Sequence, residues 1–110
     1  MARLPLRVAE TVAEYRSRLE AEMPSRVRRV TVFGSVARMQ ANEDSDVDVL
    51  VVIEPLAPRE RARAIDLGTE VGLERGLVIE PLVLSSEEWQ ALVDRRRALA
   101  EEISREGIDA

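Results

Sequence analysis

The spacing of apolar residues changes from block to block along the chain and predicts alternating helices and strands. Apolar side chains recur at helical spacing through residues 4–23, and Pro24 ends that run. Residues 26–33 are rich in β-branched side chains, and residues 47–53 are apolar almost throughout. We therefore expect a helix, a strand, and then a second strand that is buried on both faces near its middle.

The second half of the chain continues this alternation after a proline-containing break. A helix is expected over 59–72, in which Gly68 and Gly72 fit close packing or a helix end better than ligand contact. A third strand is expected over 77–84. Because Pro81 cannot donate to a ladder, this strand should lie at a sheet edge or carry a bulge.

A last helix is predicted by a capping-box pair, Ser85 with Glu88, followed by residues at helical spacing. Its inner stripe is expected to contain Trp89, Leu92, Val93, Arg96, Leu99, Ala100 and Ile103. This order of elements predicts one α/β domain over 1–110, a small mixed sheet of about three to four strands covered by helices. An apolar face on the last helix, or the edge strand at Pro81, would allow a homo- or hetero-oligomer.

Composition narrows the classes of function. The 110 residues are 45% hydrophobic and 34% charged, which is typical of a globular chain. With one Trp, one Tyr and one Phe, the core must be aliphatic, and an aromatic platform for stacking bases is not expected. The net charge of −5 argues against direct nucleic-acid binding through phosphates.

Residue types that the chain lacks narrow the chemistry further. Without cysteine or histidine there are no disulfides, no thiol catalysis, no cysteine zinc site and no imidazole base. Any catalysis must use carboxylates, hydroxyls and a hard metal ion. No apolar stretch approaches the roughly 18 residues that cross a membrane, and the N-terminus lacks a signal-peptide core, so we expect a cytoplasmic protein without membrane attachment.

One turn combines backbone freedom with a hydroxyl group. The strand at 30–33 runs into Gly34-Ser35 and then a short helix. Gly34 lets the backbone turn sharply and come close to a ligand. Ser35 lies where a hydroxyl can cap a helix and where backbone N–H groups are unpaired. The turn therefore predicts an anion site that suits phosphate.

Two carboxylates open the strand that follows. Asp46 and Asp48 flank a single valine, and side chains at i and i+2 of an extended chain leave from the same face. Beside a phosphate site they suit Mg²⁺, which commonly takes one or two carboxylates plus substrate phosphates. Two interpretations without chemistry stay open: a strand-turn-strand with a solvated acidic loop, and an Asp48 that only caps its strand.

The spacing Gly34-Ser35-x10-Asp46-x-Asp48 resembles the Gly-Ser-x10-Asp-x-Asp signature of the polymerase-β-like nucleotidyltransferases. The segment 34–38 is similar to the Gly-Ser-x-Ala-Arg-Gly text of the minimal nucleotidyltransferase (MNT) domains and departs from it at Met39. Weaker similarity continues at 81–85 and 103–107. The resemblance implies the polymerase-β-like nucleotidyltransferase fold over most of the chain.

The resemblance also implies roles for the acidic residues. Asp46 and Asp48 would be catalytic ligands of Mg²⁺. Glu80 would take the place of the family's third carboxylate, which orients or deprotonates the acceptor hydroxyl. Glu80 is one methylene longer than the usual aspartate, and it is equally well interpreted as an exposed edge-strand carboxylate.

Phosphate contacts are implied for the turn and the short helix. Ser35 and backbone N–H groups from Gly34 to Val36 would bind the β- and γ-phosphates of the nucleotide. Arg38 is expected either to meet phosphate or to pair with Asp44 or Glu43.

The resemblance extends to a biological role. Free MNT domains resemble the antitoxin of HEPN–MNT toxin–antitoxin pairs, in which the transferase adds AMP to a tyrosine of the HEPN RNase. This implies ATP as donor, a protein tyrosine as acceptor and a HEPN-type partner.

Two alternatives stay open. Met39 and Glu80, both departures from the family text, favour a silent module that neutralises a helical partner by contact. A small-molecule nucleotidyltransferase completed by a second subunit is the other.

Overall fold

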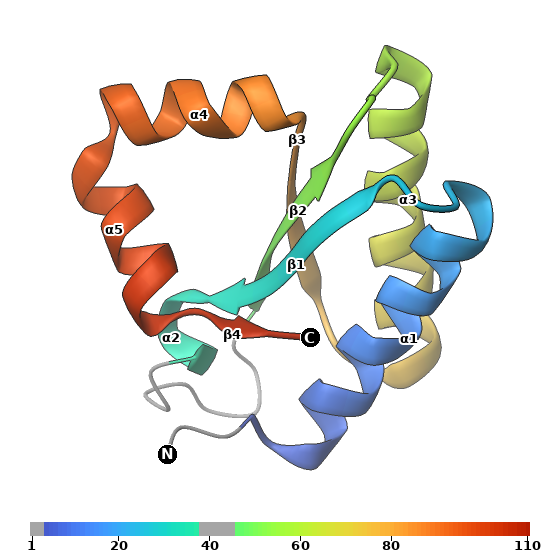
Figure 1. Ribbon diagram of the computed structural model, residues 1–110. Helices are drawn as coiled ribbons and strands as arrows, with labels where there is room; N and C mark the ends of the chain where they lie inside the picture. Colours follow the sequence, from blue (N-terminus) through green and yellow to red (C-terminus); the bar gives the residue numbers. More distant parts are fainter. Residues whose placement is uncertain (1–3, 38–45) are drawn as a thin grey trace.

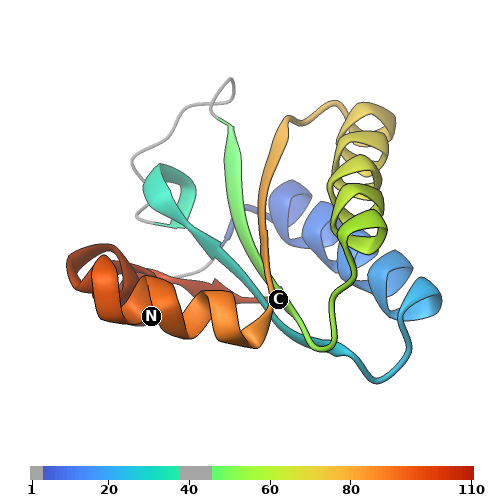
Figure 2. The same ribbon diagram turned by 90° about the horizontal axis from the view of Figure 1, so that it is seen from above.

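A four-stranded sheet lies between two pairs of helices (Figures 1 and 2). The computed structural model describes residues 4–37 and 46–110. In chain order the elements are α1 (Leu6–Glu22), β1 (Val27–Phe33), α2 (Gly34–Ala37), β2 (Val47–Ile53), α3 (Pro58–Arg75), β3 (Ile79–Leu84), α4 (Ser86–Arg95), α5 (Arg97–Glu106) and β4 (Ile108–Asp109). None of the helices described is long and apolar enough to span a membrane.

The sheet is mixed, and its strand order is β3-β2-β1-β4. β1 pairs in antiparallel fashion with both β2 and β4, whereas β2 and β3 are parallel. Parallel neighbours need a crossover connection, and α3 supplies it here. The predicted mixed α/β sheet is therefore confirmed, and β2 lies inside it with five consecutive buried residues, 49–53.

Alternate residues of the strands face two separate cores, as the strand period requires. Odd-numbered residues of β2 and β3 pack with α1 and α3, around buried side chains such as Val49 and Leu67. Even-numbered residues of the same strands pack with α4 and α5, where Leu50, Val52 and Ile103 are buried. Figure 2 shows the two helix pairs on opposite sides of the sheet.

The first crossover helix is longer than the sequence pattern predicts. The helix expected over 59–72 continues to Arg75, and Gly76 ends it in the left-handed conformation with φ of 71°. Gly72 therefore lies inside the helix, and it is a close-packing position because a Cβ there would lie 2.5 Å from the carbonyl oxygen of Leu77. Gly68 is also a close-packing position, since its Cβ would lie 3.0 Å from the ring of Pro81.

The single helix predicted after Ser85 is wrong, because the chain bends at Arg96 and forms α4 and α5. Arg96 has φ of −123° and ψ of 57°, which is outside the helical region. α4 has no fully buried residue, whereas Ala100 and Ile103 of α5 are 3% and 0% exposed. The bend therefore returns the second half of the predicted helix to the sheet (Figure 1).

The short strand β4 was not expected as a separate element. It pairs with Thr31 and Val32 of β1. The Thr31 hydroxyl donates to Asp109 over 2.6 Å and accepts from Arg29 over 2.9 Å, and the Arg29 guanidinium lies 5.1 Å from the ring centre of Trp89. Two residues of strand are too few for a sequence period, so these contacts had no signal in the pattern.

The edge strand β3 is the position predicted from Pro81. The Val78 carbonyl accepts a hydrogen bond from Val47 N–H of β2. Because the backbone direction alternates along a strand, the N–H and C=O groups of Glu80, Leu82 and Leu84 also point toward β2. The backbone groups of Pro81 and Val83 therefore point toward the open edge of the sheet. Pro81 has no N–H there, and the Val83 carbonyl accepts a hydrogen bond from Arg61 over 2.7 Å. The open edge therefore offers few groups to another strand.

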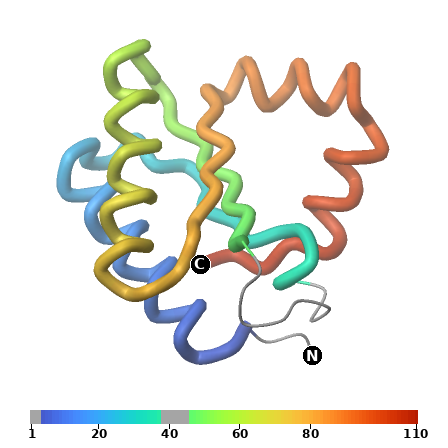
Figure 3. Tube along the Cα trace, turned by 180° about the vertical axis from the view of Figure 1, so that it is seen from behind, coloured from blue at the N-terminus to red at the C-terminus, as the bar shows by residue number. Residues whose placement is uncertain are grey.

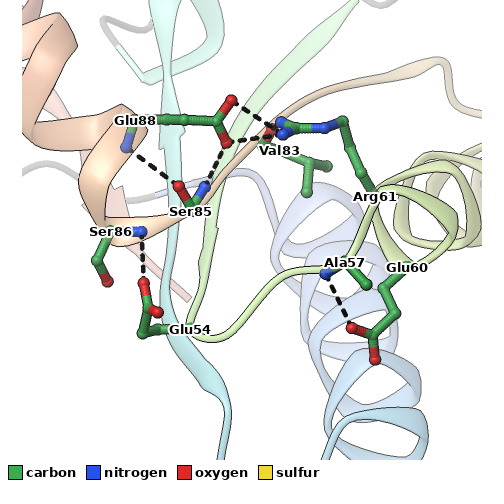
Figure 4. A network of polar contacts seen from close by, with 8 residues as sticks. All are labelled: Glu54, Ala57, Glu60, Arg61, Val83, Ser85, Ser86 and Glu88. Carbon is green, nitrogen blue, oxygen red and sulfur yellow. Dashed lines mark hydrogen bonds and ion pairs between the residues drawn. The ribbon is translucent and has the colours of Figure 1, made fainter.

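A polar network fixes the junction between β3 and α4 (Figure 4). The predicted capping box is confirmed: Glu88 N–H donates to the Ser85 hydroxyl, and Ser85 N–H donates to the Glu88 carboxylate. Arg61 of α3 donates to both oxygens of the same Glu88 carboxylate, over 2.8 and 2.9 Å. The start of α4 is thereby tied to α3, although the helix buries little of its own surface.

The close packing of α3 on the turn after it gives a test of the fold. Gly72→Ala is expected to lower the free energy of unfolding by about 1–3 kcal/mol, because the new methyl group meets backbone atoms that cannot rotate away. This loss opposes the roughly 1 kcal/mol by which alanine favours a helix. Urea denaturation measures it, with Thr69→Ala on the exposed face of α3 as the control. A Gly72→Ala variant as stable as the control would contradict the packing.

Candidate active site

The turn between β1 and α2 packs directly on the side chain of Asp48. Gly34 has a φ of 75°, a conformation that side chains disfavour. A Cβ on Gly34 would lie only 2.4 Å from Asp48 Oδ2. Both the backbone angle and the space therefore require glycine at this position, as predicted for a turn that approaches another group closely.

Strand register brings the acidic residues to the same place. Asp48 lies opposite Phe33 of β1 on one side and opposite Glu80 of β3 on the other. Residues opposite each other in a ladder point to the same face, and Asp46 precedes Asp48 by two positions. The two predicted metal ligands and the predicted third carboxylate therefore lie at one end of the sheet, on the face that α4 and α5 cover further along.

The three carboxylates interact electrostatically. The pKa of Glu80 is raised above its ordinary value, first by hydrogen bonding to Asp46 and by the charge of Asp46. Desolvation and the charge of Asp48 raise it further. The negative charges of these three carboxylates repel one another, and a bound cation would offset that repulsion.

Exposure decides which groups a ligand can reach. Asp46 and Glu80 are exposed, and Asp48 and Ser35 are half-buried. The Ser35 side chain makes no hydrogen bond with the described residues, so its hydroxyl is available to a ligand. Val36 is 6% exposed, with its side chain in the core, and only its backbone could therefore contact phosphate.

The other predicted phosphate ligand, Arg38, lies outside the described residues, 4–37 and 46–110. The same holds for its alternative partners Glu43 and Asp44 and for Met39, where the sequence departs from the family text. The roles assigned to these residues stay predictions.

The donor set suits a hard divalent cation that keeps other ligands. Among the residues that the structure describes, no group of three or more acidic side chains could hold a metal ion. The acidic end of the sheet instead offers carboxylate oxygens next to a turn built for close approach. This fits Mg²⁺, which binds through one or two carboxylates and completes its shell with substrate phosphates and water.

Two neighbouring features had no assigned role in the sequence. Phe33 is half-buried opposite Asp48, so an aromatic ring borders the acidic residues. Leu82 and Leu84 follow Glu80 on the same face of β3 and are also only half-buried. The alternation of residues along β3 predicts that Glu80, Leu82 and Leu84 share one face, but the sequence could not show that α4 leaves the two leucines partly uncovered.

Comparison with known proteins gives independent information. Residues 12–106 match the nucleotidyltransferase domain family. Two proteins of Methanocaldococcus jannaschii, each named a "putative protein adenylyltransferase", are 27% and 32% identical to the chain; each alignment covers 71% of this chain, and 80% and 74% of the respective relative.

Solved structures share the fold. The structure of a "putative minimal nucleotidyltransferase" is 32% identical, covers 88% of this chain and 93% of its own, and superposes with a TM-score of 0.52. A toxin–antitoxin crystal structure with AMP-PNP is 14% identical over 87% of this chain and 69% of its own, with a TM-score of 0.58. The MntA–HepT toxin–antitoxin structure is 13% identical over 92% of this chain and 69% of its own, with a TM-score of 0.53. At these two lower identities the likeness shows the fold alone.

Repulsion among the carboxylates predicts a gain in stability when one is neutralised. Asp46→Asn is expected to raise the free energy of unfolding at pH 7 in metal-free buffer, because it removes the carboxylate whose hydrogen bond and charge raise the Glu80 pKa most. When folding raises the pKa of a carboxyl group, the folded state releases that proton less readily than the unfolded state. The free energy of unfolding therefore falls as the pH rises from the unfolded-state pKa through the raised folded-state pKa. The gain should therefore be present at pH 7 and disappear below about pH 4.

Urea denaturation at both pH values measures this effect. Asp66→Asn, on the exposed side of α3, is the matched control and should change the free energy of unfolding by less than about 0.5 kcal/mol at either pH. An Asp46→Asn variant that is less stable than the wild type at pH 7 would show that the repulsion is already offset.

Proposed function

The chain belongs to the nucleotidyltransferase domain family and is an enzyme of this type, and we propose that it transfers AMP from ATP to a tyrosine of a HEPN-type partner protein and so acts as an antitoxin. We propose further that residues 1–110 work as one minimal nucleotidyltransferase domain in the cytoplasm. The observation that carries the proposal is the contact of the Gly34 turn with Asp48, in register with Glu80. This contact brings the turn that we propose to bind phosphate next to an acidic side chain.

In the proposed mechanism the turn binds the leaving part of the nucleotide. The Ser35 hydroxyl and backbone N–H groups of residues 34–36 donate to the β- and γ-phosphates. The left-handed Gly34 allows these donors to approach the phosphates without a side chain in between. Arg38 would add a positive charge to the same group of donors.

The carboxylates of Asp46 and Asp48 are the proposed ligands of Mg²⁺. When bound, Mg²⁺ would neutralise phosphate charge and stabilise the attacking and leaving oxygens. Asp48 is held in place by the Gly34 turn on one side and by its position inside the sheet on the other. Asp46 is exposed and directly precedes β2, two positions before Asp48.

The transfer itself is a displacement at the α-phosphorus of ATP. The tyrosine oxygen forms a new bond to this phosphorus, and the bond from phosphorus to the oxygen that bridges to the β-phosphate breaks. Pyrophosphate leaves with the electron pair, and the tyrosine proton passes to the Glu80 carboxylate. Glu80 is exposed and lies opposite Asp48 in the sheet, so its carboxylate is accessible to an acceptor hydroxyl beside the proposed metal ligands, which supports this role.

The donor and the acceptor class have support from the relatives. Two relatives are named protein adenylyltransferases, and one structure with the same fold is a toxin–antitoxin with AMP-PNP. The MntA–HepT structures are complexes with a partner protein.

A silent module that neutralises its partner by contact is the second candidate. The replacement of the family's aspartate by Glu80 favours it, because one methylene displaces the carboxylate by about 1 Å or more.

Loss of both metal-binding carboxylates separates the two candidates. Asp46→Asn with Asp48→Asn is expected to reduce transfer of label from α-labelled ATP to the partner by at least about a thousandfold, because charge on the phosphates is no longer neutralised. The assay uses the protein encoded beside this gene as the partner. Binding to it, measured by calorimetry, should survive, since only two oxygens are replaced.

The control for this experiment is Asp66→Asn with Asp94→Asn, which removes the same charge from exposed helix positions. It should transfer label as the wild type does. A wild-type chain that binds its partner but transfers no label in the presence of Mg²⁺ would assign the protein to the silent class.

The Gly34 turn gives a test that does not change any charge. Gly34→Ala and Gly76→Ala both place alanine in a left-handed conformation, with φ of 75° and 71°, and each should cost about 1–2 kcal/mol of stability. The methyl group at position 76 would meet only the flexible end of Arg7, whereas the one at position 34 would displace Asp48. Label transfer should therefore fall at least about tenfold in Gly34→Ala alone. Equal activity of the two variants would mean that the position of Asp48 is not critical.

A further inference from the structure

A recess lies in the corner where α4 leaves the end of β3. Figures 1 and 3 show α4 turning away from β3 and α5 returning to the sheet beyond it. The recess has a volume of about 220 Å³. Its walls are formed by Leu82 and Leu84 of β3 and by Ala91, Leu92, Arg95 and Arg96 at the end of α4, with Glu88 at the junction.

The walls of the recess are apolar and incompletely covered. Leu82, Leu84 and Leu92 are half-buried, and α4 contributes no fully buried residue. The face of the sheet that α5 covers well near Ile103 is thus left partly open beside β3. A space of this size takes one or two apolar side chains of another molecule.

The rim of the recess is positively charged although the chain carries a net charge of −5. The carboxylate of Glu88 already accepts hydrogen bonds from Arg61 and from Ser85 N–H, so its charge is compensated within the fold. Arg95 and Arg96 are exposed, and their guanidinium groups make no hydrogen bond or ion pair with the described part of the chain. The recess therefore combines apolar walls with two cations that have no partner in the described part of the chain.

The recess continues the face that carries the acidic residues. Glu80, Leu82 and Leu84 point to the same side of β3, because they alternate along the strand. Two residues of a strand span roughly 7 Å, so the apolar wall begins about that far from Glu80. A molecule that presents a hydroxyl group to Glu80 can thus place its neighbouring side chains in the recess.

We propose that this recess is the docking site for the acceptor protein, which binds through an acidic, amphipathic segment next to the modified tyrosine. Apolar side chains of that segment fill the corner between β3 and α4, and its acidic side chains pair with Arg95 and Arg96. This assignment rests on the proposed function, because it takes the acceptor to be a polypeptide. It adds the chemistry by which that polypeptide is chosen.

Short synthetic peptides test the docking site with the full chain. One peptide has a tyrosine flanked by leucines and glutamates; a second has lysines in place of the glutamates, and a third has serines in place of the leucines. Fluorescence anisotropy should show that the first peptide binds at least about tenfold more tightly than the other two. The lysine peptide places like charges beside Arg95 and Arg96, and the serine peptide lacks the apolar side chains that fill the recess. Label transfer from α-labelled ATP should follow the same order.

A charge exchange decides whether the rim is responsible. Arg95→Glu with Arg96→Glu should reverse the preference, so that the lysine peptide binds more tightly than the glutamate peptide. The matched control is Arg97→Glu with Arg105→Glu, which makes the same change in net charge at exposed positions of α5 outside the recess. The control should keep the wild-type preference. Ala91→Asp in the recess should weaken binding of the first peptide, whereas Gln90→Asp beside it should not.

Outcomes that overturn the docking site are distinct from a failure of the proposed function. Equal binding of the three peptides, or a preference that the Arg95 and Arg96 exchange leaves unchanged, would overturn the site even if label still passes to the partner protein. A dimer of the chain that the same exchange dissociates, seen by analytical ultracentrifugation, would assign the recess to a second copy instead. Peptide binding in the expected order without any transfer of label would leave the docking site standing and reject the transferase activity.

Discussion

The structure depends on holding the carboxylate of Asp48 against a backbone turn from a neighbouring strand. β2 is buried on both faces along most of its length, and a charged side chain on such a strand is unfavourable unless something compensates it. Asp48 lies near the strand start, where its side chain is only half-buried and packs against the Gly34 turn. The surrounding hydrophobic core fixes the backbone of β2, and the left-handed Gly34 lets the adjacent turn come within contact distance. The same feature that would weaken the strand therefore gives the acidic end its defined geometry.

Much of this arrangement could be predicted from local pattern. The strand expected over 47–53 is β2 as observed, and the capping box opens α4 at the predicted position. Pro81 correctly indicated an edge strand, because a missing N–H is a local property that excludes an interior position. Glu80 lies on the same face as Asp48, but only the parallel register of β2 and β3 places the two opposite each other. Register between distant strands is decided by the packing of α3, so the sequence offered Glu80 only through the resemblance.

The bend at Arg96 and the strand β4 lie beyond what a pattern can show. Apolar spacing continues through the bend, since both the straight and the bent helix place Leu99, Ala100 and Ile103 on one stripe. What selects the bent form is tertiary: a straight helix leaving β3 would carry Ile103 away from the sheet, whereas the bent one buries it completely. β4 likewise exists because the end of α5 is brought next to β1, where Thr31 and Asp109 form a hydrogen bond. In both cases non-local burial decides the conformation, and intrinsic propensity is a weak guide there.

One face of the sheet has acidic residues at one end and borders a recess with a basic rim at the other, and the bend explains the recess. At one end Asp46, Asp48 and Glu80 repel one another, which a chain selected for stability alone would avoid. At the other end α4 departs from β3 before α5 returns, so Leu82 and Leu84 remain half-buried, and the exposed Arg95 and Arg96 line the recess from the end of α4. A continuous helix packed flat on the sheet would bury those leucines and remove the recess. The chain instead buries Ala100 and Ile103, the residues that anchor α5, and leaves the strip beside Glu80 accessible. Incomplete burial next to an acidic group is what a protein needs if it must both hold a nucleotide and receive a second macromolecule on the same face.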